Sequence, residues 1–326
     1  MWDRELVVRI LKHYSEIDYV FTEDDFYSVN GILGASLFWE KPFHLHTPID
    51  SLPVNDYAFN NIFTYCDKIY IPNSSYQRFD GRKRLNFSEG DKVRERQGDT
   101  LKSVQLHHGV DTDMFYPDRY VPRLDEFTFL WSGRMEPRKS PGRILKAWEM
   151  IHDKMDAVLH MRGNWDSPLG ARVLQYIHKK DLPVMVDLME DVPHHEIKDV
   201  YNKADVNLCT AKAGGFEMNI TEAASCELPS IVTDSTFMNE VVVDNETGWL
   251  IPVDGYTHPP DGYNPLAMDR MWGNISVEHL AKQMEWCYLN QSKVKMMGRY
   301  ARTYVEKTYN WKDIAYRLKG EILNEG

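Results

Sequence analysis

A pair of glycines opens the segment of this chain whose residue types and spacing best suit chemistry. Gly214 and Gly215 begin the run GGFEMNITEAASCELPSIVTD, in which a turn leads into a short helix expected at 220–226 and then into an apolar strand. The first amides of a helix lack partners within the helix, and the helix dipole adds partial positive charge at the same end. A phosphate group is the natural ligand of such a turn. The alternative is a plain connection between a helix and a strand, so the turn alone does not define a site.

Two earlier segments, HHGVDTDMFYP at 107–117 and FLWSGRMEPRKSPGRILKAW at 129–148, precede the glycine turn. In order and spacing the three segments resemble retaining glycosyltransferases with the GT-B fold, within glycosyltransferase family four (glycosyl transferases group 1). The resemblance implies an α/β chain of two Rossmann-like parallel-sheet domains that face a cleft. It further implies transfer of a hexose from a nucleotide-diphosphate sugar, with UDP or GDP as the favoured nucleotide, to a hydroxyl acceptor. Measured against the family, the resemblance also implies an amino-terminal domain that is truncated and lacks its first strands.

Basic residues of the second segment match the family's diphosphate site. By the resemblance, Gly133, Arg134 and Lys139 lie at the carboxyl end of a parallel strand, where ligands bind in such sheets. An arginine can contact two phosphate oxygens at once, and a lysine adds a compact charge. Arg138 is an alternative to either residue. The ordinary alternative for all three cations is a solvated surface charge.

The glycine turn and its helix supply the remaining donor contacts. The resemblance implies that backbone amides of Gly215, Phe216, Met218 and Asn219 meet the diphosphate, because main-chain donors do not depend on side-chain identity. It implies that Glu222 accepts hydrogen bonds from the ribose hydroxyls. The alternative for Glu222 is a favourable interaction with the helix dipole alone.

One family carboxylate is missing from this sequence. Glu222 matches the second glutamate of the family's E-x7-E signature, and the first, which contacts the transferred sugar, falls at Gly214. Glu217 stands three residues later, where the family has a glycine, and is our candidate catalytic acid. Three interpretations stay open: Glu217 replaces the lost carboxylate, the sugar preference is altered, or catalysis is lost.

Histidines extend the predicted site into the first domain. His46, in PFHLHTP at the end of an expected strand, matches the family histidine that contacts the donor sugar and is our second catalytic candidate. His44 shares its strand face and is expected in the core. His108 stands where the family has an asparagine, in a stretch that we interpret as mainly structural.

Composition limits the other possibilities. A net charge of −11 argues against a protein whose whole surface binds nucleic acid or anionic lipid. The four cysteines lack metal-ligand spacing, and no leader or span of roughly 20 apolar residues is evident. We therefore expect a cytoplasmic protein, at most peripheral at a membrane. The resemblance implies no metal and no cofactor beyond the donor.

Short apolar strands alternate with amphipathic segments, which is typical of parallel sheets covered by helices. Strands are expected near 19–22, 43–46, 68–71, 103–107, 128–131, 158–161, 184–188, 206–208, 230–233 and 248–251. Helices are expected at 4–14, 28–38, 56–66, 140–155, 169–179, 194–203, 220–226, 277–290 and, with a break at Tyr309-Asn310, 293–323. We predict an acceptor domain at 1–120, a nucleotide-sugar domain at 121–305, and a terminal helix at 306–326 that crosses back.

A domain without these opening strands is expected to leave the strand near Tyr19 as an edge, and exposed edges attract partners. We expect a homodimer, a partner chain, or a locally rearranged minimal domain there. A second functional hypothesis is a non-catalytic or partner-dependent subunit that retains the donor-binding fold. A third is a viral-type transferase acting on modified nucleic acid, supported only by the basic residues around 80–102. Acids interleaved with these basic residues favour a solvated loop instead, so no stable nucleic-acid association is expected.

Overall fold

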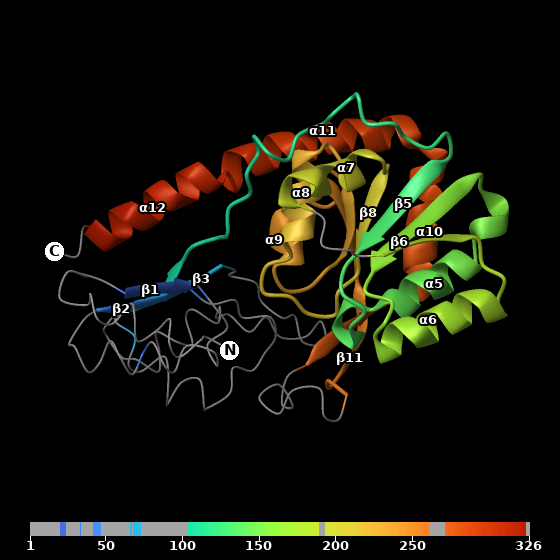
Figure 1. Ribbon diagram of the computed structural model, residues 1–326, viewed down its shortest axis with the longest axis horizontal. Helices are drawn as coiled ribbons and strands as arrows, with labels where there is room; N and C mark the ends of the chain where they lie inside the picture. Colours follow the sequence, from blue (N-terminus) through green and yellow to red (C-terminus); the bar gives the residue numbers. More distant parts are fainter. Residues whose placement is uncertain are drawn as a thin grey trace.

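The computed structural model describes residues 20–23, 33, 42–46, 66, 68–72, 103–188, 193–260 and 271–323. Within these ranges the strands form two parallel sheets and one small antiparallel ribbon (Figure 1). The α/β architecture with two parallel sheets is therefore confirmed. Tyr19, the charged stretch 80–102 and, except for single positions, the helices expected at 4–14, 28–38 and 56–66 lie outside the described residues.

The first sheet contains four parallel strands in the order β1-β2-β3-β4. Their bounds are β1 Val20–Glu23, β2 Phe43–His46, β3 Lys68–Ile71 and β4 Ser103–Gln105. Every residue of β2 is buried, as expected for a parallel strand covered on both faces. Among the strands described, β1 lies at an edge of this sheet, and Phe21 on it is exposed. A partner at this edge stays a prediction.

The second sheet has six parallel strands in the order β10-β9-β8-β5-β6-β7. Their bounds are β5 Phe127–Ser132, β6 Ala157–Gly163, β7 Val184–Leu188, β8 Val206–Cys209, β9 Ser230–Thr233 and β10 Gly248–Ile251. The sequence FTFLW of β5 is buried throughout. Such a continuous apolar run suits a central strand with helices on both faces.

Alternation along β5 separates two cores. Phe129 and Trp131 pack in one cluster with Trp148 and Met284, whereas Leu130 belongs to a cluster on the other face. The first face is covered by α5 Pro141–Glu149, α6 Pro168–Lys179 and α10 Val277–Leu289 (Figure 1). The second is covered by α7 Ile197–Asn202, α8 Met218–Ser225, α9 Met238–Val241 and the carboxyl-terminal half of α11 Gln291–Thr308.

Two features differ from the expected elements. The helix predicted at 140–155 ends at Glu149, and a separate 3-10 turn, η4 (His152–Lys154), follows it. Two strands not predicted from the sequence, β11 (Val253–Thr257) and β12 (Trp272–Ile275), form an antiparallel ribbon. Residues 256–273 are rich in Pro, Gly and Asp, and the pairing of their two ends is a tertiary feature that local composition does not encode.

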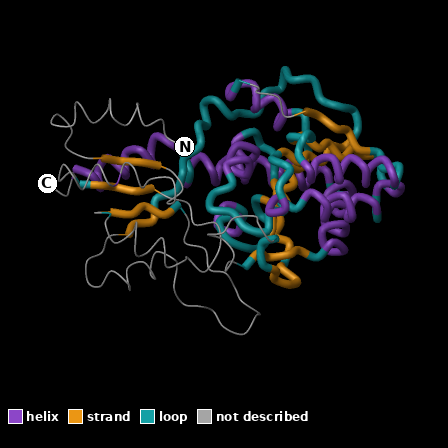
Figure 2. Tube along the Cα trace, turned by 60° about the horizontal axis from the view of Figure 1, so that its bottom comes forward, coloured by secondary structure: helices purple, strands orange, loops and turns teal. Residues whose placement is uncertain are grey.

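The chain ends with a helix that returns to the first sheet. Helix α11 stops at Thr308, and α12 (Trp311–Leu323) continues across the first sheet (Figures 1 and 2). Ile314 packs in a small cluster with Tyr70 and Leu106. Lys68 Nζ donates to Glu321 at 2.9 Å. Helix α12 is therefore an integral part of the covering of β3 and β4.

The chain crosses itself where it leaves the first sheet. The Val110 amide donates to the Tyr309 carbonyl at 2.8 Å, and the Trp311 amide donates to the Val110 carbonyl at 3.2 Å. A Cβ atom on Gly109 would lie 2.2 Å from the Trp311 Cα atom. Only glycine permits this approach, because the obstructing atom is backbone and cannot rotate away.

His107 packs beside the same crossing. Its Nδ1–H donates to the Pro72 carbonyl at 2.6 Å, and its ring lies edge-on to Tyr309 at 5.0 Å between centroids. Burial lowers the pKa of His107 despite the hydrogen bond to Pro72, and the nearby Arg317 lowers it further. The neutral imidazole is therefore the form that this packing favours.

We expect Gly109→Ala to destabilise the protein by about 1–3 kcal/mol, the usual cost of overpacking. The added methyl must displace the backbone at the α11–α12 break. The matched control is Gly142→Ala in α5, where a Cβ meets nothing within 4 Å. Thermal melting of both variants measures the effect, and equal melting temperatures would contradict the close approach.

We expect stability to fall as the pH drops below about 6.5, the ordinary histidine value. Because the folded-state pKa of His107 is lowered, the unfolded chain binds more protons in this window, and stability rises with pH. His107→Gln should flatten the slope of melting temperature against pH between pH 7.5 and 5.5. The exposed His178 offers the control, because His178→Gln should leave the slope unchanged.

Candidate functional site

Two loops meet at the carboxyl ends of neighbouring strands β5 and β8. Loop 133–139 follows β5, and loop 210–217 follows β8. The Lys212 amide donates to the Arg138 carbonyl at 2.8 Å, and Arg138 Nη1 donates to the Ala213 carbonyl at 2.6 Å. These bonds hold the two loops together at the edge where ligands bind in open parallel sheets.

The side chains of Arg138, Lys139 and Glu217 form a compact group that we call the Glu217 cluster. Arg138 Nη1 lies 3.0 Å from Glu217 Oε1, and Lys139 Nζ donates to Oε2 of the same carboxylate. The Glu217 side chain is only 7% exposed. Burial raises its pKa, but the charges of Lys139 and Arg138 outweigh burial and leave the pKa below its ordinary value. Glu217 is therefore an ionised, buried carboxylate held by two cations.

Arg134 lies apart from this cluster. Its guanidinium is largely exposed and pairs with Glu136 at 3.1 Å. The neighbouring backbone is well anchored, since the Gly133 amide donates to the Arg162 carbonyl at 3.1 Å. Of the cations considered from the sequence, the structure thus brings together Lys139 and Arg138. Arg134 is not joined to them.

Gly214 gives the Glu217 side chain its space. A Cβ atom on Gly214 would lie 2.4 Å from Glu217 Oε1 and 2.8 Å from its Cγ. The Glu217 carboxylate therefore lies against the bare Cα of Gly214. A side chain at position 214, where the family has its glutamate, would therefore begin at the place that the Glu217 carboxylate now occupies.

The amino end of α8 contributes the other residues of the predicted turn. Glu217 is the N-cap residue, but its side chain makes no capping bond and extends to the cations instead. Met218 is exposed, Gly215 is buried, and the Asn219 side chain lies near the thiol of Cys209 at 3.7 Å. The predicted residues of the turn are thus contiguous with the Glu217 cluster.

Phe216 connects the turn to the first lobe, the part of the chain that is built on the first sheet, as distinct from the second lobe, which is built on the second sheet. Its ring lies 3.9 Å from that of Phe237 and 4.9 Å from that of His108, centroid to centroid. The His108 ring lies 4.5 Å from His46. His46 Nε2–H donates to the Leu106 carbonyl at 2.8 Å. His46 therefore reaches the glycine turn through His108, in an aromatic series that sequence reasoning did not foresee.

His44 is buried, and its Nδ1 lies 3.3 Å from the Tyr70 hydroxyl. Glu222 is also buried, in the middle of α8, and accepts a hydrogen bond from the Tyr201 hydroxyl at 2.6 Å. Burial and the Glu222 charge raise the pKa of Tyr201. Glu222 thus faces α7 within the second core, and its predicted contact with a ribose stays a prediction.

Four buried hydroxyls near this edge were not anticipated. Among the described residues, Thr210, Thr233, Ser235 and Thr236 each bury a hydroxyl without a protein partner. Thr210 and Thr233 follow or end the paired strands β8 and β9, on the same edge as the two loops. Serine and threonine are too common for their types alone to reveal such a group.

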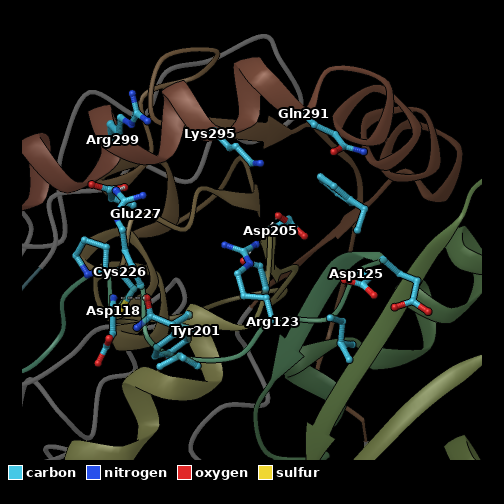
Figure 3. A pocket seen from close by; sticks show the side chains of 18 of the residues that line it. Asp118, Arg123, Asp125, Tyr201, Asp205, Cys226, Glu227, Gln291, Lys295 and Arg299 are labelled. Atoms are coloured by element: carbon cyan, nitrogen blue, oxygen red, sulfur yellow. Dashed lines mark hydrogen bonds and ion pairs between the residues drawn. The ribbon is translucent and has the colours of Figure 1, made fainter.

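A cavity of about 650 Å³ lies at the other end of the second sheet (Figure 3). It is lined by side chains of both charges, among them Asp118, Arg123, Asp205, Lys295 and Arg299. These residues surround the amino ends of β5 and β8. The cavity is therefore separate from the Glu217 cluster.

Ion pairs fix the segment between the two sheets along this cavity. Lys198 binds Asp118 at 2.9 Å, and Arg123 pairs with Asp205.

Within the described segments every helix is either too short or too polar to pass through a bilayer. No group of three or more His, Cys, Asp or Glu side chains suited to a metal ion occurs in these segments.

Residues 115–256 match the family model described as "Glycosyl transferases group 1". D-inositol 3-phosphate glycosyltransferase of Mycobacteroides abscessus is 25% identical over 214 residues, which cover 61% of this chain and 47% of that protein. The enzyme of the same name from Paenarthrobacter aurescens is 25% identical over 251 residues, with 72% and 56% covered. The chain spans about half the length of the curated relatives it matches.

Solved structures resemble the whole chain. Anabaena Alr3699/HepE, in complex with UDP and glucose, superposes with a TM-score of 0.75 at 13% identity, covering 98% of this chain and 81% of that one. A glycosyltransferase from Rickettsia africae gives a TM-score of 0.73 at 18% identity, with 98% and 79% covered. The predicted GT-B architecture is therefore confirmed, and the segment matched by the family model, 115–256, contains the Glu217 cluster.

Proposed function

We propose that this chain is a retaining glycosyltransferase that moves a hexose from a nucleotide-diphosphate sugar to a hydroxyl acceptor. The observation that carries the proposal is the convergence of Arg138 and Lys139 at the carboxyl ends of β5 and β8, within the matched domain. Two adjacent cations on one sheet edge suit a diphosphate, because each can neutralise one phosphate. The donor's cationic contacts then need no metal ion.

In this proposal the second lobe holds the donor. Lys139 and Arg138 bind the diphosphate together with the backbone amides of 215–219 at the start of α8. Arg134, which is exposed on the same loop, reaches the outer phosphate oxygens. Glu222 serves the ribose once its bond to Tyr201 is exchanged.

The catalytic step needs little proton chemistry from the protein. The bond from the anomeric carbon to the diphosphate oxygen breaks, and the acceptor oxygen bonds to the same face of the sugar. The acceptor proton passes to the departing diphosphate, which acts as the base. Positive charge that develops on the ring is stabilised by the carboxylate of Glu217, and His46 contacts the sugar from the first lobe.

The choice of nucleotide is a proposal that the neighbours support. Anabaena HepE was solved with UDP-glucose, so a uridine nucleotide is the first donor to test. The acceptor is a hydroxyl compound of unassigned type. A partner-dependent subunit is the second candidate function, favoured by Gly214 and by the β1 edge, and it would bind donor without turnover.

We expect Lys139→Ala to reduce or abolish the melting-temperature increase produced by UDP, GDP or their sugars. A ligand that binds only the folded state raises this temperature by mass action, and loss of one charged contact weakens binding by about 10- to 100-fold. Lys146→Ala, an exposed lysine on α5, is the matched control and should retain the full shift. An unchanged shift in Lys139→Ala would exclude the lysine from the site.

We expect Glu217→Gln to lower kcat for sugar transfer on the order of 100-fold, as typical for loss of one group that stabilises transition-state charge. The control is Glu149→Gln, which removes a carboxylate that pairs with Lys180 outside the site. Turnover of nucleotide sugars by the purified chain measures both. If no variant and no wild-type preparation turns over donor that it binds, the partner-dependent subunit is the better interpretation.

A further inference from the structure

The two cations of the Glu217 cluster are already occupied by a carboxylate of the chain itself. Arg138 and Lys139 contact separate oxygens of Glu217, and all three side chains are less than 20% exposed. Glu217 is the N-cap residue of α8, yet its side chain makes no capping bond. The cations, and not the helix end, therefore set the orientation of this carboxylate.

The bare backbone at Gly214 makes this arrangement possible. A side chain there would start 2.4 Å from Glu217 Oε1, so any residue other than glycine would push the carboxylate away from its present position. All three atoms nearest to such a Cβ belong to the Glu217 side chain and not to backbone. A change in the side-chain torsions of Glu217 can therefore move the carboxylate while the backbone of the turn stays in place.

Charge balance prevents the carboxylate and a diphosphate from sharing the two cations. The cluster carries two positive charges and one negative charge, whereas the diphosphate of a nucleotide sugar carries about two negative charges. With Glu217 retained, three negative charges would face two positive ones in a poorly solvated place. Like charges at such short distances repel each other strongly in a low-dielectric site.

Arg138 is also held in place by hydrogen bonds to the chain itself. Arg138 Nη1 also donates to the Ala213 carbonyl at 2.6 Å, and its own carbonyl accepts the Lys212 amide. These bonds do not involve Glu217. They keep Arg138 in place when the carboxylate leaves.

We propose that Glu217 is an internal anion that occupies the diphosphate position of the empty protein and is exchanged for the diphosphate when the donor binds. The inference rests on the proposed function and adds a regulatory step to the same site. A ligand with a single weak anionic group gains no free energy by replacing the carboxylate, whereas a diphosphate pairs with both cations. The displaced carboxylate becomes available to the sugar only after the diphosphate is bound.

The test measures binding of inorganic pyrophosphate and UDP by calorimetry at fixed ionic strength. We expect Glu217→Gln to bind pyrophosphate on the order of 10-fold more tightly than wild type, since a neutral amide competes less for the cations. Gly214→Ala should also tighten binding, by a smaller factor, because its methyl displaces the carboxylate while the net charge is kept. Glu149→Gln, with an equal change in charge outside the cluster, should bind as wild type does.

Gly214→Ala keeps the experiment decisive if Glu217→Gln folds poorly with two unpaired cations. Equal or weaker pyrophosphate binding in the folded variants would overturn the exchange, and sugar transfer by wild type in the turnover assay would leave the proposed function standing. Tighter pyrophosphate binding in both variants, with no sugar transfer by wild type in that assay, would support the exchange and oppose the transferase. Absence of pyrophosphate and UDP binding in every protein would overturn both.

Discussion

A buried carboxylate must be paired with cations, and this requirement organises the carboxyl edge of the second sheet. Glu217 is nearly inaccessible to solvent, and without Arg138 and Lys139 its charge would be costly to bury. The cations come from the loop after β5 and the carboxylate from the loop after β8. The ion-pair cluster, together with the hydrogen bonds of Arg138 to Lys212 and Ala213, therefore holds the two loops in their relative position.

The cluster is also connected to the first lobe. Phe216, adjacent to Glu217 in the chain, packs on His108, and His108 packs on His46 of β2. The Glu217 turn therefore contacts the first sheet through side-chain rings as well as through the covalent connection at 106–126. That connecting segment is held to the second lobe by the pair Lys198–Asp118.

The sequence predicted the fold more completely than the site. Apolar runs such as FTFLW identify β5 because both faces of a central parallel strand are buried. Lys139 and Glu217 were also selected from the sequence, and the structure joins them. The sequence favoured Arg134 over Arg138, whereas the structure places Arg138 beside Lys139, because side-chain direction within a loop depends on tertiary partners such as the Ala213 carbonyl. The burial of Glu222 against Tyr201 likewise depends on how α7 packs on α8.

The crossing at Gly109 limits how the two lobes can rearrange. The segment 106–126, which links the two sheets, and the α11–α12 break are hydrogen-bonded to each other through Val110 and Tyr309, so both connections between the lobes pass through one place. The Tyr309 hydroxyl donates to the Glu240 carbonyl at 3.2 Å, and Gln105 of β4 contacts the Glu240 carboxylate at 3.4 Å. The Phe216 ring, next to Glu217 in the chain, lies 6.1 Å from the Tyr309 ring, centroid to centroid. The proposed exchange of the Glu217 carboxylate therefore takes place beside the crossing that joins the two lobes.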